Sequence, residues 1–346
     1  MESAQALKLA EHAARRTAIQ HWLESVSGVH PITLHPMIGD ASTRRYFRVD
    51  VRGASFVVMD APPEHENCHA FVAIAKALRE VGLNTPDILE SDLTQGFLLL
   101  TDFGESTYLS SLNAQNADHL YDKALDALAV LQSCDFVNDH AIPPFTANFI
   151  QKEWSWHKEW FLEKFLGLAI SDIENDLDRS YNQIVTAVMS QPHVFMHRDY
   201  HSANLMVLDE NEVGILDFQD AFIGPVTYDL VSLLRDCYIA WPKDRVHGWV
   251  KSYHQKLIAQ GMLENVSDEE FLRWFDWMGM QRHLKALLTF SRKHVRDQQS
   301  QYLRFVPRTL HYLLMVSEQY PELIILHDFL RLTVKPAVER NLLCAL

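Results

Sequence analysis

Residues 197–204 read HRDYHSAN, and Asp217 follows after a short apolar hairpin. In a string of the form HRD-x-x-x-x-N, the Asp accepts the proton of an attacking hydroxyl. The Asn holds a metal ion together with a second Asp further along the chain. The spacing therefore predicts Asp199 as the base and Asn204 and Asp217 as the ligands of Mg²⁺. Together these side chains predict a phosphoryl-transfer site that uses ATP.

The residues around this string predict how its polar groups meet. Residues 205–208 and 213–216 are apolar and flank a polar turn at 209–212, as in a tight hairpin. Asn204 enters this hairpin and Asp217 leaves it, so we expect the two side chains to lie side by side. One oxygen-seeking cation could then bind both residues.

Two alternative interpretations of the string are weaker. Asp199 and Asp217 could be ordinary turn residues, but the full spacing and the hairpin behind it argue against a chance match. His197 and His201 could instead bind a transition metal at i, i+4, as on the helix of a zincin. The string lacks the glutamate of HExxH and lies in a predicted loop, which excludes that interpretation.

Composition indicates a globular enzyme of the cytoplasm. The 346 residues can bury a large core, and 48% of them are hydrophobic. The net charge of -14 argues against a nucleic-acid partner. We find neither a signal peptide nor an apolar run long enough to span a bilayer. The cysteines have no metal-binding spacing and are expected to be reduced; they are Cys68, Cys134, Cys237 and Cys344.

The order of the predicted elements indicates a protein-kinase-like, bilobal α+β fold. A helix that Gly28 and Pro31 end is followed by short strands and one helix, and from about residue 106 the pattern is mostly helical. The predicted strands cover 46–51, 55–59, 86–89 and 96–100, and the helix between them covers 71–81. We expect a small β-rich, nucleotide-binding N-lobe at 1–101, a hinge at 102–106, and a larger, mostly helical catalytic and acceptor-binding C-lobe at 107–346.

Residues 102–104 spell DFG, but they precede HRD by almost a hundred residues. A metal-binding DFG follows HRD in the chain. We therefore interpret Asp102 as a cap and Gly104 as a turn residue of the hinge. Asp217, within the string LDFQD, is the functional counterpart.

The strings HRDYHSANLMVL and GILDFQDAFIGPVTYDLVSLLRDCY resemble the aminoglycoside phosphotransferase and choline kinase superfamily. Within it, the chain is similar to the anomeric sugar kinases that phosphorylate N-acetylmuramate and N-acetylglucosamine in cell-wall (peptidoglycan) recycling. The resemblance covers most of the chain, from DASTRRYFRV to QRHLKALLTFSR. It implies a cytoplasmic, ATP- and Mg²⁺-dependent kinase with a small-molecule sugar as its partner.

The resemblance also implies roles for individual residues. Asp199 would be the base and Asn204 and Asp217 the magnesium ligands, as the spacing already indicates. Asp229 would brace the catalytic loop, of which His197 and Arg198 would be the structural supports. From the residues alone, Asp229 is only an acid in the first turn of a helix at 228–238, where it favours the helix dipole.

The sequence departs from the kinase pattern at the phosphate-binding lysine. Met59 and Phe71 stand where a strand lysine and its glutamate partner are expected. Losing both avoids burying one charge without its partner. We expect the loop at 39–45 to hold the phosphates through backbone N–H groups of 40–43 and the side chains of Ser42, Thr43 and Arg44 or Arg45. The alternative is a solvated hairpin tip.

The helical region after Asp229 is expected to form the acceptor pocket. A lactyl carboxylate on N-acetylmuramate would need a cationic partner. The cations in the matching segments are Arg235, Arg282, His283, Lys285 and Arg292, of which we select Arg235, Arg282 and His283. Surface salt bridging is the alternative for any one of them.

Two other functions remain open at this point. An aminoglycoside acceptor would need a cluster of carboxylates, but the acids of this region look dispersed over helix surfaces and caps. A choline-type phosphotransferase belongs to the same alternative. A pseudokinase or scaffold is the second alternative, and the three intact oxygen ligands argue against it. No nucleic-acid or membrane partner is expected, and a monomer is the simplest oligomeric state.

Overall fold

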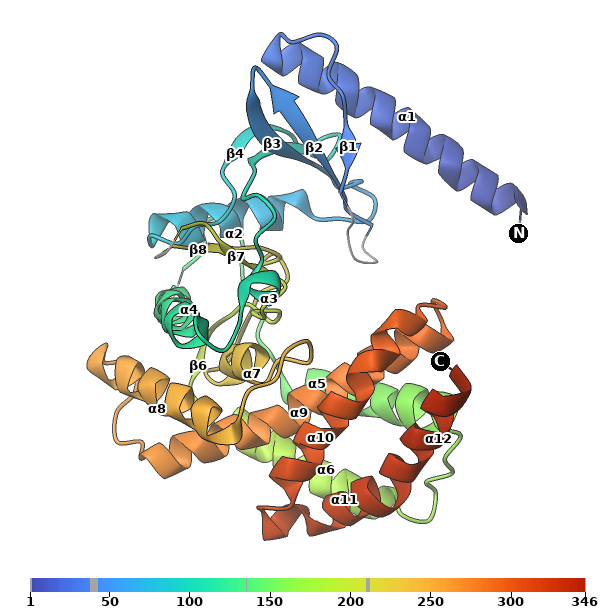
Figure 1. Cartoon of the computed structure of the whole chain (residues 1–346), viewed down its shortest axis with the longest axis vertical. Helices are drawn as coiled ribbons and strands as arrows, with labels where there is room; N and C mark the ends of the chain where they lie inside the picture. The colour runs from blue at the N-terminus through green and yellow to red at the C-terminus, as the bar shows by residue number, and fades with distance from the viewer. Residues whose placement is uncertain (1, 38–42, 135, 210–211, 346) are drawn as a thin grey trace.

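The computed structural model describes residues 2–37, 43–134, 136–209 and 212–345, and the side chains of residues 10–343 within these ranges. Figure 1 shows a small sheet with one long helix at one end of the molecule and a large group of helices at the other. None of the helices in the described ranges is both long and apolar enough to cross a membrane.

The N-terminal part contains a five-stranded antiparallel sheet in the order β1-β2-β3-β5-β4. The hairpin predicted from the alternating pattern around Arg52 is present, and the last two strands begin slightly later than predicted. The strands are β1 (His35–Pro36), β2 (Arg45–Val51), β3 (Ala54–Asp60), β4 (Ile88–Asp92) and β5 (Phe97–Thr101).

The sheet is covered on both faces because apolar residues alternate between them. Val58 and Leu99 face the helix α1 (Glu2–Ser27) and form a small core with its Leu23. Their neighbours in the chain, Met59 and Leu98, face the other way, toward α2 (Cys68–Glu80), and belong to the large core.

The remainder of the chain is mostly helical. The segments are α3 (Tyr108–Ser111), α4 (Ala117–Gln132), α5 (Ala147–His157), η1 (Lys158–Phe165), α6 (Glu174–Met189), α7 (Tyr228–Leu234), α8 (Lys243–Ala259), α9 (Asp268–Val295), η2 (Ser300–Phe305), α10 (Val306–Ser317), η3 (Pro321–Leu323), α11 (Ile324–Phe329), η4 (Leu330–Val334) and α12 (Lys335–Ala345). The hydroxyl of Ser267 accepts a hydrogen bond from the Glu270 N–H at 3.1 Å and so caps α9. At 28 residues, α9 is long enough to pack against α5, α6, α7, α8 and α10.

Two short antiparallel strand pairs lie between the sheet and the helices. β6 (His193–Met196) pairs with β9 (Phe222–Pro225), and β7 (Leu205–Val207) pairs with β8 (Val213–Ile215). In Figure 1 the β7–β8 hairpin lies beside α2. The Ile215 N–H donates to the Asn84 carbonyl at 2.8 Å, which ties this hairpin to the chain that follows α2. The two ends of the molecule therefore meet at the predicted catalytic hairpin.

Candidate active site

The catalytic loop is fixed by the carboxylate of Asp229, which lies on α7 and is fully buried. Its oxygens accept the backbone N–H groups of His197 at 2.6 Å and of Arg198 at 3.0 Å. Burial raises the pKa of Asp229 to about 7, and these two hydrogen bonds oppose the rise. Asp229 is therefore placed to hold the backbone of the loop that presents Asp199.

His197 and Arg198 support the same loop in different ways. The Leu216 carbonyl lies 2.9 Å from His197 Nε2 and can only accept, so Nε2 carries the proton and Nδ1 accepts the Asp199 N–H at 3.2 Å. Burial lowers the pKa of His197 to about 4, which keeps the ring neutral. Arg198 has a positive φ of 77° and places its guanidinium 4.9 Å from the centre of the Phe222 ring.

Asp236 is a further support of the loop that the sequence did not reveal. It is buried, and its carboxylate accepts the Ser202 N–H at 3.1 Å and also the Ser202 hydroxyl. The sequence places Asp236 among acids that look dispersed over helix surfaces. Because the contact joins residues 34 positions apart, no local pattern indicates it.

Asp199 lies beside two cations of α9. Its Oδ1 atom is 3.9 Å from Arg282 Nη2 and 3.9 Å from Lys285 Nζ, and about a third of the side chain (35%) is exposed. Burial acts to raise the pKa of this carboxyl, but Lys285, Arg282 and the other nearby cations outweigh it and hold the pKa well below its usual range. Asp199 is thus ionised at neutral pH, as a proton acceptor must be.

Asn204 and Asp217 are neighbours, as the hairpin predicts. Asn204 Nδ2 lies 3.4 Å from Asp217 Oδ2 and donates to the Asp199 carbonyl at 3.0 Å. The Gln219 side chain donates to Asp217 Oδ1 at 2.8 Å. Mg²⁺ in phosphoryl-transfer sites is held by one or two carboxylates and by the phosphates of the nucleotide. One carboxylate and one amide at this distance fit such an ion.

A cavity of about 680 Å³ opens in front of these groups. One part of it is apolar, with side chains from β3, β5, α2 and the β7–β8 hairpin. The other part carries Asn204, Asp217, Arg44 and Tyr46. The apolar lining residues include Val57, Phe71, Leu100, Met206 and Leu216. An aromatic base can bind the apolar part while its phosphates reach the polar part.

Arg44 lines this cavity and forms an ion pair with Glu66 at 2.6 Å. Each of the two side chains is only 12% exposed. The hydroxyl of Thr43 donates to the same glutamate. Glu66 lies two residues before α2, so the ion pair connects the start of β2 to the start of that helix. Ser42 and the backbone of 40–42 lie outside the described residues.

Arg45 differs from the expectation, because it does not reach the cavity. Alternation along β2 turns it away from the face that Arg44 and Tyr46 share. Its Nε donates to Asp60 Oδ2 at 2.8 Å, and Arg15 of α1 donates to Asp60 Oδ1 at 2.9 Å. Arg45 therefore joins the sheet to α1.

The positions of the missing lysine and glutamate are apolar and buried. Met59 and Phe71 both belong to the large core. Phe71 packs against Phe218, with ring centroids 4.9 Å apart. These two positions therefore offer no charge to a phosphate, and Arg44 is a cation that the cavity presents there instead.

The earlier DFG string is structural, as its position in the chain indicates. Asp102 accepts hydrogen bonds from Arg48 at 2.6 Å and from the Ser55 hydroxyl at 2.6 Å. It also accepts the Gly104 N–H at 2.9 Å, which is the predicted capping contact, and Gly104 has a positive φ of 81°. Asp102 thus fixes the connection that follows β5.

Two of the three expected acceptor residues lie in the core, away from Asp199. Arg235 is 1% exposed and forms an ion pair with Asp276 at 2.6 Å. The ring of His283 lies 3.0 Å from the Arg235 carbonyl and stacks on Tyr312, and burial lowers its pKa to about 3. Arg235 is held by Asp276 of α9, and His283 of α9 is held by the Arg235 carbonyl. The sequence could not show these contacts.

Arg282 is the expected residue that the fold does bring to the site. Its Nη2 donates to the Arg198 carbonyl at 3.2 Å and to the Ser232 hydroxyl. Lys285, named among the cations but not selected, lies equally close to Asp199. Its spacing of three from Arg282 puts both on one face of a helix, and that signal could have identified it.

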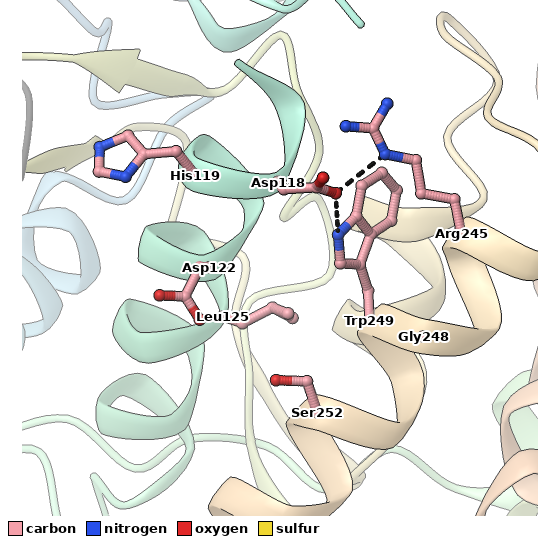
Figure 2. A pocket seen from close by; sticks show the side chains of 8 residues that line it. All are labelled: Asp118, His119, Asp122, Leu125, Arg245, Gly248, Trp249 and Ser252. Atoms are coloured by element: carbon pink, nitrogen blue, oxygen red, sulfur yellow. Dashed lines mark hydrogen bonds and ion pairs between the residues drawn. The ribbon is translucent and has the colours of Figure 1, made fainter. Parts of the chain in front are cut away.

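A second pocket, of about 530 Å³, lies between α4 and α8 and shares no lining residue with the first. Figure 2 shows that Asp118 of α4 binds Arg245 and Trp249 of α8 across this pocket. Asp118 accepts from Arg245 at 2.9 Å and from the indole N–H of Trp249 at 3.0 Å. These contacts join α4 to α8. We assign this pocket no part in the proposed reaction.

The kinase-like fold, with Asp199 on a loop beside Asn204 and Asp217, is the arrangement expected of a phosphotransferase. The chain belongs to the phosphotransferase enzyme family, whose profile matches residues 33–275. The choline kinase of Streptococcus pneumoniae has the same fold, with a TM-score of 0.61 at 12% identity over 87% of this chain and 99% of that one. An ADP-bound aminoglycoside phosphotransferase gives a TM-score of 0.58 at 13% identity, over 85% of this chain and 97% of that one.

Curated relatives are closer in sequence. A Pseudomonas aeruginosa protein named N-acetylmuramate/N-acetylglucosamine kinase is 42% identical over 303 residues, which cover 87% of this chain and 89% of that protein. A Neisseria meningitidis protein of the same name is 35% identical over 322 residues, which cover 91% of this chain and 95% of that one.

Proposed function

We propose that the protein transfers the γ-phosphate of ATP to the anomeric hydroxyl of N-acetylmuramate or N-acetylglucosamine. The observation that carries the proposal is the position of Lys285 and Arg282, each 3.9 Å from Asp199 Oδ1. Cations beside the base suit the negative charge of a transferred phosphate. The names of the Pseudomonas and Neisseria relatives support the same acceptors.

A polycationic aminoglycoside fits this surface poorly, because it would meet cations beside the base. Three of the acids that could have opposed such a ligand have other partners. Asp236 holds Ser202, Asp276 pairs with Arg235, and Asp268 pairs with Lys251 at 2.9 Å. The pseudokinase alternative is disfavoured because Asn204 and Asp217 line one cavity and Asn204 also holds the backbone carbonyl of Asp199.

In the proposed mechanism, Asp199 orients the anomeric hydroxyl and accepts its proton as the bond to phosphorus forms. Asn204 and Asp217 would hold Mg²⁺, which when bound supplies positive charge to the β- and γ-phosphates. Arg44 would contact the phosphates from the sheet side, and Arg282 and Lys285 would offset the charge gathered around Asp199. The anomeric hydroxyl is more acidic than the other sugar hydroxyls, so a carboxylate is a sufficient base.

We propose that three consecutive segments of the chain have different roles. Residues 1–101 would form the nucleotide-binding lobe, 102–106 the hinge, and 107–346 the catalytic and acceptor-binding lobe. A cytoplasmic enzyme of this kind would return cell-wall amino sugars to metabolism as anomeric phosphates. Its partner would be the small-molecule sugar.

The test is ADP release from ATP and Mg²⁺ with four acceptors: N-acetylmuramate, N-acetylglucosamine, kanamycin and choline. Asp199→Asn is the matched control, since it keeps the size of the side chain. We expect turnover with the two N-acetyl sugars alone. Turnover with kanamycin or choline alone would contradict the proposal, and no turnover with any of the four would support the scaffold alternative.

A further inference from the structure

The middle of helix α9 is buried on almost every side, and the accessible positions there lie on one face. From Phe275 to Ser291, every residue is buried except Lys285 and Thr289, and Arg292 is the next accessible one. The spacing of four and then three residues places these side chains on one face of the helix. This accessible line, which comprises Lys285, Thr289 and Arg292, begins beside Asp199.

Helix α5 packs across α9 near this line. Gln281 of α9 donates to Glu153 of α5 at 2.8 Å, and burial raises the pKa of that glutamate although nearby Lys285 opposes the rise. Three residues further along α5, the ring of Trp156 lies 6.0 Å from the guanidinium of Arg292, and both side chains are partly exposed. Arg292 therefore lies beside an indole ring at the far end of the accessible line from Asp199.

The length of this path suits a substituted sugar. Seven residues of helix rise by about 10 Å, and helical side chains lean back toward the N-terminus, here toward Lys285. Because both side chains lean the same way, the tips of Lys285 and Arg292 are separated by about the same rise. A hexosamine whose anomeric hydroxyl is at Asp199 would extend along α9 and bring an acid on its far side toward Arg292.

Arg292 is also the cation best suited to a carboxylate. Within the described ranges it has no salt bridge, and its Nε is buried without a hydrogen-bond partner. Burial lowers the pKa of its guanidinium, and nearby Arg296 adds to the effect. Lys285, in contrast, lies beside Asp199, where a second carboxylate would meet a like charge.

We propose that Arg292 binds the lactyl carboxylate of N-acetylmuramate, and so determines the preference for this sugar over N-acetylglucosamine. The inference rests on the proposed function and adds its specificity-determining residue. The planar guanidinium can hold a carboxylate through two parallel hydrogen bonds, which an ammonium group cannot do. The face of Trp156 is available to the apolar side of the sugar ring.

The experiment measures kcat/KM for both sugars, which differ only in the lactyl group. We expect Arg292→Ala to lower the ratio of kcat/KM for N-acetylmuramate to that for N-acetylglucosamine by about 10- to 100-fold. Arg292→Lys should lose part of this preference. Arg296→Ala, a few residues further on and paired with Asp297 at 2.6 Å, is the matched control and should keep the wild-type ratio.

A second measurement uses the wild-type protein with the methyl ester of N-acetylmuramate, which has no charge. The ester should be a poorer substrate than the acid for the wild type and an equal one for Arg292→Ala. A wild-type ratio in Arg292→Ala, or equal use of ester and acid by the wild type, would overturn the inference alone. Failure of the wild type to use either sugar would overturn the proposed function as well.

Discussion

The guanidinium of Arg44 and the carboxylate of Glu66 form an ion pair of 2.6 Å at the cavity that also contains Asp217. A kinase places its ion pair between a strand lysine and a helix glutamate. Here those positions are Met59 and Phe71, and the pair instead joins residues just before β2 and just before α2. We interpret it as the replacement that orients a cation toward the phosphates.

Removing Arg44 should weaken nucleotide binding. Arg44→Ala is expected to raise KM for ATP by about tenfold, since one charge-assisted contact is worth about 1.5–3 kcal/mol. Glu66→Gln should raise KM less, because the arginine stays but loses its orientation. Lys76→Ala, at an exposed position of α2, is the control in steady-state kinetics. An unchanged KM for ATP in Arg44→Ala would contradict the assignment.

Asp199→Asn should remove the proton acceptor without removing the nucleotide site. We expect kcat to fall by at least about 100-fold, the lower limit for losing a general base. The affinity for ATP, measured by calorimetry, should change by less than about threefold, because the side chain lies on the acceptor side. Loss of ATP binding in the same variant would instead make Asp199 a structural residue.

Buried neutral histidines should make the fold sensitive to acid. Burial lowers the pKa of His157 from 6.5 to about 4, and its Nδ1–H donates to the Leu284 carbonyl at 2.8 Å. Between these two pH values the unfolded chain binds a proton that the folded chain does not, so stability falls as the pH is lowered from 6.5 to 4. This one residue accounts for up to about 3 kcal/mol of the fall.

His157→Asn keeps an N–H donor and removes the titration. The free energy of unfolding in urea should therefore depend less on pH in this variant than in the wild type. Lost packing lowers the free energy by a constant amount at every pH and does not change this comparison. His21→Asn, at an exposed position of α1, is the control and should keep the wild-type slope. If the free energy of unfolding of His157→Asn changed with pH as it does in the wild type, the His157 ring would be protonated in the folded protein.

The Arg235–Asp276 ion pair should affect stability and not substrate binding. Both side chains are almost fully buried, and Tyr320 also donates to Asp276 at 2.7 Å. Arg235→Met leaves a buried carboxylate without its cation, and we expect a loss of about 3–5 kcal/mol in the free energy of unfolding. The folded variant should keep the wild-type KM for sugar. A raised KM for sugar with an unchanged free energy of unfolding would instead indicate that Arg235 binds the acceptor.

The sequence predicts the contact between Asn204 and Asp217 because its geometry is local. Asn204 and Asp217 are joined by one tight hairpin, so their spacing along the chain already specifies their contact. The acceptor side is different, because α9 is buried on nearly all sides and has no apolar stripe to show which face is outward. His283 and Lys285 therefore look equivalent in the sequence, although one is in the core and the other is beside Asp199.

Pairings between distant residues were also beyond the sequence. Arg44 and Glu66 come from separate elements, and only the packing of α2 against the sheet brings them together. Asp236 and Ser202 meet in the same way, across α7 and the catalytic loop. Such contacts depend on tertiary structure and leave no periodic signal.

The most direct test of the account is the position of the phosphate in the product. The protein, ATP and Mg²⁺ would be incubated with N-acetylglucosamine, and the product examined by phosphorus–proton correlation in NMR. We predict that the phosphorus couples to H-1 of the sugar, that the product is labile to acid, and that Asp199→Asn yields none. A phosphate attached to any other hydroxyl of the sugar would contradict the anomeric kinase reaction.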